Sequence, residues 1–338
     1  MSRAPRIGLV GATSMLGREV AASLADQSVL QLGELRAFGS ETSFCEDLEF
    51  GEDLIEVRIG PTDFSGLDLV VICTTPGIAL DEVRQALRVE VPCIDCSGAL
   101  LSSSEVPLRI ADLSAEKAAP TAPLVTSPSG ASLAWARVLS VLENEVGVMR
   151  VVGSVLHSAS VQGHEGIEDL SSQTLALLSQ APVPESSAFA APVAFDCFPH
   201  MGDSPGEGKD DVCPSEEGLM NSLRRLLGPD LKMAVTSVQV PIFAGEGSAL
   251  CIETRHPVEL EQAEQWFEAR PGITVVADAL KASTRSAVGR EDVFVARLRR
   301  DASAEDPTRS LMLWLSADPL RLAAQNAAQL VQARFTAD

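Results

Sequence analysis

The first part of the chain alternates short apolar runs with longer amphipathic segments. Residues 6–10 and 68–72 are apolar runs of strand length, and Val20 and Leu24 recur at helical spacing after the first run. The same patterns predict strands at 35–38, 93–94 and 124–125, and helices at about 78–87 and 132–142. Strands that alternate with helices through short loops indicate a parallel sheet with helical crossovers. A doubly wound nucleotide-type domain is therefore expected up to about residue 130.

The pattern changes after this region. It predicts a strand at 151–155, a helix at 166–178, strands at 273–276 and 293–298, and an alanine-rich helix at 320–335. Residues 232–243 and 248–253 have the pattern of strands, and Ala244-Gly245-Glu246-Gly247 between them predicts a hairpin. A second domain with a mixed or antiparallel sheet is therefore expected. The length of 338 residues also exceeds that of one ordinary core.

The charge balance limits the class of partner. The chain has 47 acidic and 26 basic residues, a formal net charge of −21. Such a surface repels phosphate backbones and anionic lipids, so we expect neither nucleic-acid nor membrane binding. A small ligand or a protein partner is expected instead.

The N-terminal residues, the lengths of the apolar runs and the cysteines lead us to expect a cytoplasmic protein. Residues 1–5 lead directly into the first strand without a signal segment, and no apolar run approaches the ~18 residues of a membrane span. The seven cysteines are an odd number and widely spread, which is typical of reduced thiols in the cytosol. Cys93 and Cys96 have CxxC spacing, but in a strand residues three apart point to opposite faces. No metal site is expected, since the four histidines have no ligand spacing either.

A glycine-bearing loop follows the first strand. Gly11 and Gly17 occupy the first and third glycine positions of a G-x-x-G-x-x-G loop that opens a helix, and Ser14 stands at the middle position. Backbone N–H groups and the helix dipole at such a loop hold a pyrophosphate. The loop predicts a dinucleotide site, and a tight structural turn left from an older function is the alternative.

Seven stretches of the chain follow one another in the order of a known family. They are residues 6–17, 39–43, 94–101, 194–200, 238–246, 293–299 and 314–329. Together they resemble aspartate-semialdehyde dehydrogenases, and most of all their Usg-type paralogues that lack the catalytic cysteine. The first stretch resembles the family's opening strand and its G-A-T-G-x-x-G loop. The resemblance covers nearly the whole chain.

The resemblance implies an α/β fold with two domains. Residues 1–130 would form a Rossmann-like doubly wound dinucleotide domain, completed by a C-terminal helix at 318–338. Residues 131–317 would form an inserted α+β dimerisation and substrate domain, like the C-terminal domain of glyceraldehyde-3-phosphate dehydrogenase. NAD or NADP is the implied cofactor and a homodimer the implied assembly. The implied cofactor-binding residues are Gly11, Thr13, Ser14, Met15, Leu16, Gly17, Ser40, Ser43 and Asn326.

The chain departs from the family at the positions that carry the chemistry. The nucleophilic cysteine of N-P-N-C is replaced by Gly130, the general-base histidine by Glu246, and the glutamine beside the nucleophile falls near His157. The reaction adds a thiolate to the aldehyde, transfers hydride to the nicotinamide and leaves a thioester; glycine offers no atom for that bond. The anion-holding side chains are also replaced, at Leu101, Gln239, Gly218 and Ser222, and the arginine for an NADP 2′-phosphate falls at Thr42 beside Glu41.

Two functional hypotheses remain. The first is a catalytically degenerate family member that keeps the fold, the dimer and NAD(P) binding, as a homodimer or as a heteromer with an active paralogue. The second is an active NAD(P)-dependent semialdehyde oxidoreductase of amino-acid biosynthesis with a non-cysteine mechanism. Its substitute nucleophile would be Ser129, with Ser132 as a second candidate, because both flank position 130 at a helix start.

Overall fold

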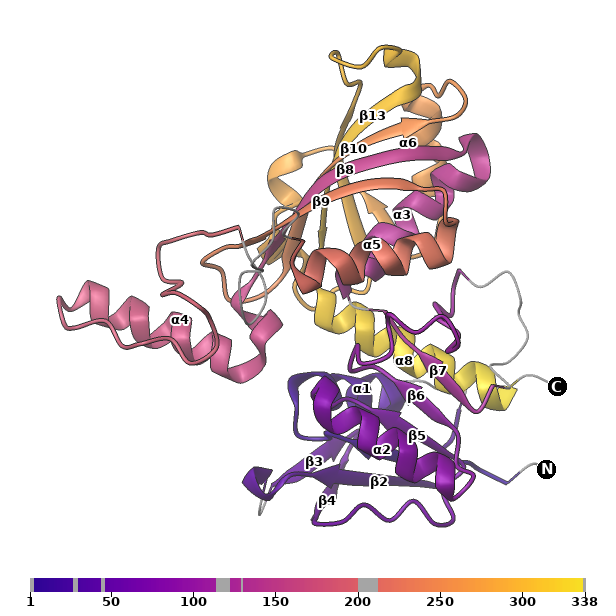
Figure 1. Cartoon of the computed structure of the whole chain (residues 1–338), viewed down its shortest axis with the longest axis vertical. Helices are drawn as coiled ribbons and strands as arrows, with labels where there is room; N and C mark the ends of the chain where they lie inside the picture. The colour runs from indigo at the N-terminus through magenta and orange to yellow at the C-terminus, as the bar shows by residue number, and fades with distance from the viewer. Residues whose placement is uncertain are drawn as a thin grey trace. The chain divides into compact units, whose positions relative to one another are not determined.

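The computed structural model describes residues 3–26, 30–43, 46–113, 122–128, 130–199 and 212–336. The chain divides into two compact units. Unit 1 comprises Met1–Gly130 and Leu320–Asp338, and unit 2 comprises Ala131–Pro319. Each unit contains its own β-sheet (Figure 1). In the described part of the chain, no helix is long and apolar enough to cross a membrane.

Unit 1 is a doubly wound sheet with the strand order β3-β4-β2-β1-β5-β6-β7. The strands are β1 (Arg6–Val10), β2 (Glu34–Gly39), β3 (Asp47–Phe50), β4 (Asp53–Ile59), β5 (Leu69–Ile72), β6 (Cys93–Asp95) and β7 (Leu124–Thr126). All neighbours pair in parallel except β3 and β4, an antiparallel pair at one edge that the sequence pattern did not predict. The helices are α1 (Met15–Asp26), α2 (Pro76–Arg88) and α8 (Pro319–Thr336). The expected parallel sheet with helical crossovers is confirmed.

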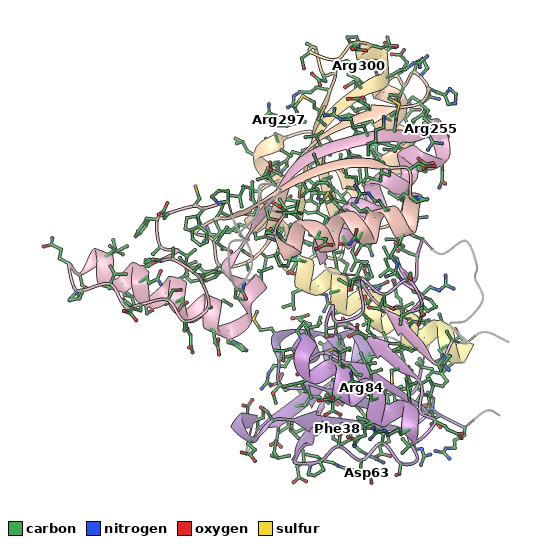
Figure 2. The ribbon with its side chains drawn as sticks, viewed as in Figure 1. Phe38, Asp63, Arg84, Arg255, Arg297 and Arg300 are labelled. Atoms are coloured by element: carbon green, nitrogen blue, oxygen red, sulfur yellow. The ribbon has the colours of Figure 1, made fainter. Side chains whose placement is uncertain are left out.

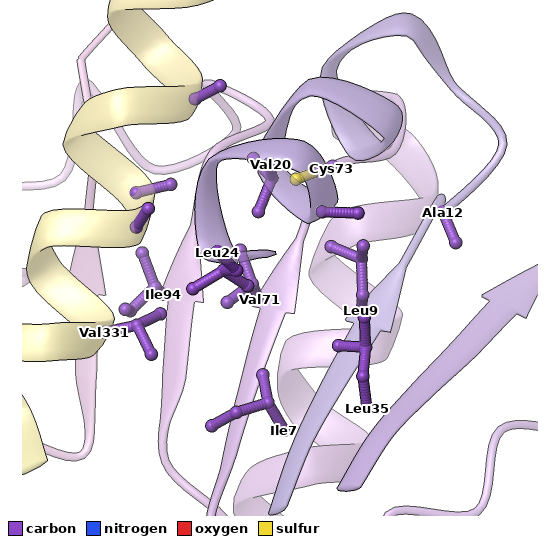
Figure 3. Close-up of a cluster of buried hydrophobic side chains, with 14 of the residues drawn as sticks. Ile7, Leu9, Ala12, Val20, Leu24, Leu35, Val71, Cys73, Ile94 and Val331 are labelled. Carbon is purple, nitrogen blue, oxygen red and sulfur yellow. The ribbon is translucent and has the colours of Figure 1, made fainter. Parts of the chain in front are cut away.

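Alternate side chains of these strands enter two separate cores. Leu9, Val71 and Ile94 belong to one cluster, together with Leu24 of α1 and Val331 of α8 (Figure 3). Their neighbours along the strands belong to a second cluster with α2, formed by Val10, Val70, Ile72, Val83, Ala86 and others. Because the central strands β1 and β5 are buried on both faces, helices must cover both faces of the sheet. The C-terminal helix α8 therefore completes the hydrophobic core of unit 1.

Unit 2 is a mixed six-stranded sheet with the order β11-β12-β13-β10-β8-β9. The strands are β8 (Val148–His157), β9 (Lys232–Gln239), β10 (Glu246–Thr254), β11 (Ile273–Val275), β12 (Val293–Arg299) and β13 (Ser310–Ala317). The helices are α3 (Gly130–Val146), α4 (Gly163–Leu178), α5 (Pro214–Leu227), α6 (Leu260–Glu268) and α7 (Thr284–Ala287). The mixed sheet was expected, whereas β13 and α6 were not. Trp314 lies in β13, so the stretch that resembles the family's final helix begins in a strand.

The predicted hairpin between β9 and β10 is wrong. β8 lies between these two strands, parallel to β9 and antiparallel to β10. The connecting segment crosses the end of β8, because Val240 N donates to His157 O and Ala159 N donates to Ile242 O. The short glycine-containing connection therefore joins β9 and β10, which pair with the two opposite edges of β8.

The helix α4 extends away from the six-stranded sheet (Figure 1). Asp169 in this helix is 7% exposed and binds residues 186–188, where the chain runs back along α4. It accepts hydrogen bonds from Ser186 Oγ at 2.5 Å, Ser187 N at 2.9 Å, Ser187 Oγ at 3.1 Å and Ala188 N at 2.8 Å. Burial alone would raise the pKa of Asp169, but these hydrogen bonds outweigh it and hold the pKa below the usual aspartate value.

Candidate functional site

The glycine loop of unit 1 lies where the strand order reverses direction. β1 is flanked by β2 on one side and β5 on the other, so chain segments diverge from the carboxyl ends of β1 and β5. Gly11 follows β1 with φ of 73°, and an added Cβ there would lie 2.6 Å from Cys73 O after β5. A Cβ at Gly17 would lie 2.1 Å from Gly11 O. Both positions therefore require glycine for the close approach of backbone to backbone.

Ser14 is part of the turn itself. Its Oγ donates to Cys73 O at 2.9 Å and accepts from Gly17 N at 2.9 Å, which is the capping arrangement for a helix that starts at Met15. The N–H groups of Met15 and Leu16, at the first two helical positions, have no intrahelical acceptor. The loop therefore keeps the donors and the positive helix end that a pyrophosphate needs.

The end of β2 supplies the other predicted cofactor residues. Ser43 is buried and its Oγ lies 2.7 Å from Thr13 Oγ1, which ties the segment after β2 to the glycine loop. Ser40 precedes it, and Glu41 is exposed. The side chain of Thr42 lies outside what the structure describes. This places an exposed carboxylate after β2, where a dinucleotide-binding fold contacts the ribose.

Asn326 of α8 is a buried anchor within unit 1. Its Oδ1 accepts from Ala111 N at 2.9 Å, and its Nδ2 donates to Ser127 Oγ at 2.8 Å and to Arg109 O at 3.1 Å. Both amide hydrogens are thereby used, which leaves one lone pair of the amide oxygen. The residue that resembles a cofactor neighbour therefore holds residues 109–111, which precede β7, together with Ser127, which follows it.

The resemblance aligns the family nucleophile with Gly130, which is the first residue of α3. Gly130 is buried there, and no thiol or hydroxyl replaces the missing side chain at that position. Ser129, the predicted substitute nucleophile, lies outside the described residues. Ser132 is fully buried.

In unit 2, His157 and Glu246 form a buried pair. β10 and β8 pair antiparallel with Gly247 opposite Leu156, so Glu246 at the start of β10 comes opposite His157 at the end of β8. Nδ1 of His157 lies 2.5 Å from Oε1 of Glu246, and the two side chains are only 7% and 6% exposed. The residues at two family site positions thus contact each other.

The polar contacts continue from His157 into α5. Its Nε2 lies 3.3 Å from Ser237 Oγ of β9, and Ser215 Oγ donates to Ser237 Oγ at 2.8 Å. Ser215 Oγ also lies 3.2 Å from Cys213 Sγ. Glu216 fixes the start of α5 against β9, because it accepts from Ser237 N at 2.8 Å and from Cys213 N at 3.1 Å.

Sequence reasoning did not find Ser215, Ser237, Cys213 or Glu216 as site residues. The one available signal was the C-x-x-E spacing of Cys213 and Glu216, which the structure uses as a capping box. The serines have no motif spacing, because the fold brings them together from two distant segments.

Two side chains at replaced family positions are buried near this network. Gln239 is paired in register with His157 on the adjacent strand, and Ser222 lies two helical turns beyond Ser215 on α5. Gln239 Oε1 and Ser222 Oγ have no hydrogen-bond partner among the described residues. Gly218 of α5 has open space around its Cα, and Leu101 of unit 1 is half-buried. None of these positions carries a cation for an anionic substrate.

Three further residues, Arg297, Gly163 and Gly166, occupy positions where the backbone geometry or the available space is unusual. Arg297 is exposed with φ of 56°, at the irregularity where β12 departs from its register with β13 (Figure 2). Gly166 requires glycine, because an added Cβ would lie 2.3 Å from Ala159 O. Gly163 has φ of 68° and open space around it.

The CxxC cysteines lie on opposite faces of the sheet, as predicted. Cys93 belongs to the core under α2 and Cys96 packs against the other core. Burial raises the pKa of Cys93 to about 12. A hydrogen bond with Cys73 and burial raise the pKa of Cys96 well above its usual range. The hydrogen-bond partner of Cys96 is thus Cys73, the cysteine after the neighbouring strand. The thiols of Cys93 and Cys96 stay protonated near neutral pH.

Comparison with known proteins identifies matches over both units. The family description "Semialdehyde dehydrogenase, NAD binding domain" matches residues 6–120, and "Semialdehyde dehydrogenase, dimerisation domain" matches residues 139–322. The chain is 29% identical over 341 residues to the aspartate-semialdehyde dehydrogenase of Rickettsia bellii, with 98% of each chain covered.

Solved structures give the same result. A probable aspartate-semialdehyde dehydrogenase from Pseudomonas aeruginosa is 26% identical with a TM-score of 0.88, over 98% of both chains. Aspartate semialdehyde dehydrogenase II from Vibrio cholerae has a TM-score of 0.89 at 24% identity, again over 98% of both chains, which shows the shared fold.

Proposed function

We propose that this chain, which belongs to the aspartate-semialdehyde dehydrogenase family, binds a nicotinamide dinucleotide but does not catalyse the family's thiol-dependent oxidation. The match to an NAD-binding domain and the glycine loop of unit 1 support the first part. The residues at the reacting positions support the second part.

The observation that carries the proposal is the buried pair of His157 and Glu246. Both ring nitrogens of His157 have partners within unit 2, and Glu246 Oε1 contacts His157. The carboxylate at the position of the family base is therefore engaged by a neighbouring side chain. Gly130 has no side chain that could receive assistance from a base.

The missing thiol prevents a specific step. In the reaction that the family resemblance implies, a thiolate forms a bond to the aldehyde carbon before the hydride leaves that carbon for the nicotinamide. The nicotinamide supplies only the hydride acceptor when bound. The residues at positions 130, 239 and 101 supply neither the nucleophile nor a cation for phosphate. A folded dinucleotide domain without this step is a binding module.

The test is a turnover assay with aspartate semialdehyde, phosphate and either NAD or NADP, run beside the Glu246→Ala variant to exclude contaminating host enzyme. We expect no reduced cofactor above the level of the variant. Turnover that scales with the concentration of the wild-type protein and falls in the variant would favour the second hypothesis, an active oxidoreductase with a different nucleophile.

We also propose that NAD is preferred over NADP. Glu41 is exposed in the segment after β2, and a carboxylate there accepts hydrogen bonds from a bare ribose and repels a 2′-phosphate. Fluorescence titration with NADH and NADPH measures this preference. We expect tighter binding of NADH, and Glu41→Gln should reduce the difference.

For the assembly, we propose a homodimer formed through unit 2. The match to a dimerisation domain supports this assignment. Ala249 lies exposed in the middle of the sheet face opposite to α3, beside half-buried Trp314, Cys251 and Val152. Light scattering should give a dimer for the wild type and a monomer for Ala249→Arg. A wild-type monomer that dimerises only with an active aspartate-semialdehyde dehydrogenase would support the heteromer instead.

A further inference from the structure

We propose that Ser215 is the nucleophile of an acyl-transfer site within unit 2, activated through Ser237 by the pair of His157 and Glu246. The substrate class is a small carboxylic ester, which the site would cleave through an acyl-serine. This activity is independent of the dinucleotide and of the dehydrogenase reaction.

The base of this site is fixed by its buried partner. Glu246 accepts at Oε1, 2.5 Å from His157 Nδ1, so the proton of the neutral imidazole lies on Nδ1. Nε2 is then the acceptor and lies 3.3 Å from Ser237 Oγ. A hydroxyl, an imidazole and a carboxylate in this order are the arrangement that activates serine in unrelated hydrolase folds.

Ser237 is inaccessible to a substrate, so its role is to relay the proton and not to attack. Its exposed fraction is 1%, whereas Ser215 is partly exposed. Ser215 Oγ donates to Ser237 Oγ at 2.8 Å, which leaves the Ser237 hydroxyl proton free to point at His157 Nε2. The two hydroxyls therefore connect the buried base to a serine that solvent reaches.

The start of α5 provides stabilisation of negative charge. Ser215 is the second residue of this 14-residue helix, and Pro214 before it has no N–H. The N–H of Ser215 has no intrahelical acceptor, so it can donate to the oxygen that becomes negative when Ser215 attacks a carbonyl. In serine proteases the nucleophile's own N–H has this role.

A second observation indicates a polar ligand beside the same network. Gln239 Oε1 and Ser222 Oγ are buried without partners among the described residues. Gln239 lies next to His157 across the strand pair, and Ser222 shares the helix face of Ser215. Buried polar atoms are almost always paired, so hydrogen-bond partners outside the described residues are expected here, and a polar ligand would supply them.

The reaction balances without a redox partner. Ser215 Oγ forms a bond to the acyl carbon, its proton passes to Ser237, and the proton of Ser237 passes to His157 Nε2. The bond between the acyl carbon and the leaving oxygen breaks, and the leaving alcohol takes the proton back from His157 through Ser237. Water then attacks the acyl carbon and passes its proton through Ser237 to His157. The bond between the acyl carbon and Ser215 Oγ breaks, and Ser215 Oγ takes this proton back through Ser237.

The experiment uses the full-length protein with a fluorophosphonate probe and with p-nitrophenyl acetate. Peptide mass spectrometry should locate the phosphonyl group on Ser215. The rates of labelling and of ester cleavage should fall at least about tenfold in Ser215→Ala, Ser237→Ala and His157→Gln, because the relay is broken in each. Ser179→Ala, which removes an exposed hydroxyl at the end of α4, should keep the wild-type rates.

Ser237→Thr separates relay from folding. It restores a hydroxyl at the same carbon, so labelling should return to within about threefold of wild type, with tryptophan emission and Tm unchanged. Absence of label, label on another serine, or wild-type labelling in a folded Ser237→Ala protein would overturn the proposal. A failure here leaves the proposed loss of dehydrogenase activity untouched, since that is measured by cofactor reduction.

Discussion

The two units keep their family features by different means. In unit 1 the glycine loop depends on backbone geometry: Gly11 and Gly17 allow the close approach, and Ser14 closes the turn. In unit 2 the candidate site depends on side chains, since His157 and Glu246 contact each other. The resemblance aligns Glu246 with the family histidine and places the family glutamine near His157. A site built from N–H groups survives sequence divergence as long as its glycines remain. A side-chain site can be rebuilt by a few substitutions while the sheet beneath it is unchanged.

The comparison can be tested separately in each unit. The three tryptophans, Trp135, Trp266 and Trp314, all lie in unit 2. Tryptophan emission therefore reports unfolding of unit 2 alone, and dinucleotide titration reports on unit 1. This matters because the two units need not unfold in a single transition.

The largest effect is expected from breaking the buried pair. His157→Ala leaves the Glu246 carboxylate buried without its partner and should lower the free energy of unfolding of unit 2 by about 3–5 kcal/mol. Denaturant unfolding followed by tryptophan emission measures it. The exposed His256→Ala is the matched control and should change stability by less than about 0.5 kcal/mol. Equal stability of the two variants would show that the pair is not a structural unit.

A smaller effect is expected in unit 1. Gly17→Ala places a methyl group 2.1 Å from Gly11 O. The backbone must shift, which should cost about 1–3 kcal/mol and abolish dinucleotide binding, with the tryptophan-detected stability of unit 2 unchanged. NADH titration and circular dichroism measure these effects. Gly77→Ala, with open space around its Cα at the start of α2, is the control. NADH binding at wild-type affinity in Gly17→Ala would contradict the account of the loop.

The smallest effect concerns α4. Asp169→Asn should destabilise the 163–199 segment by about 1–2 kcal/mol, because the carboxylate accepts four hydrogen bonds. The pKa of Asp169 is lowered in the folded state, so its stabilisation is present above the usual aspartate pKa and is lost as pH falls through the folded value. The measurement is amide hydrogen exchange of this segment, with the rates corrected for the intrinsic effect of pH. Protection from exchange should increase with rising pH in the wild type and should increase less in Asp169→Asn. The same pH dependence in both proteins would exclude this role.

The sequence pattern predicted most elements but not how the second sheet is ordered. β1 matches its predicted bounds, and α2 and α8 differ from theirs by a few residues. The hairpin prediction failed because a short glycine-containing connection looks the same whether its strands pair directly or on both sides of β8. The two cases are distinguished by the pairing of β8 with both β9 and β10, and by the hydrogen bonds of Val240 and Ile242 with His157 and Ala159.

The site was predicted one position at a time, and so the pair was missed. His157 and Glu246 were each recognised as replacements, 89 residues apart in the chain. Their contact follows from the antiparallel register of β8 and β10, which the sequence pattern does not specify. The signal available in the sequence was that the resemblance implies changes at both positions, a histidine near the family glutamine and a glutamate at the family histidine.

The central claim is that the chain binds a dinucleotide without oxidising an aldehyde through a thiol. The most direct measurement follows NADH binding and cofactor reduction on one preparation, with aspartate semialdehyde and phosphate present. We predict saturable binding and no turnover above that of Glu246→Ala. Turnover proportional to the amount of wild-type protein, and absent in Glu246→Ala, would contradict the claim.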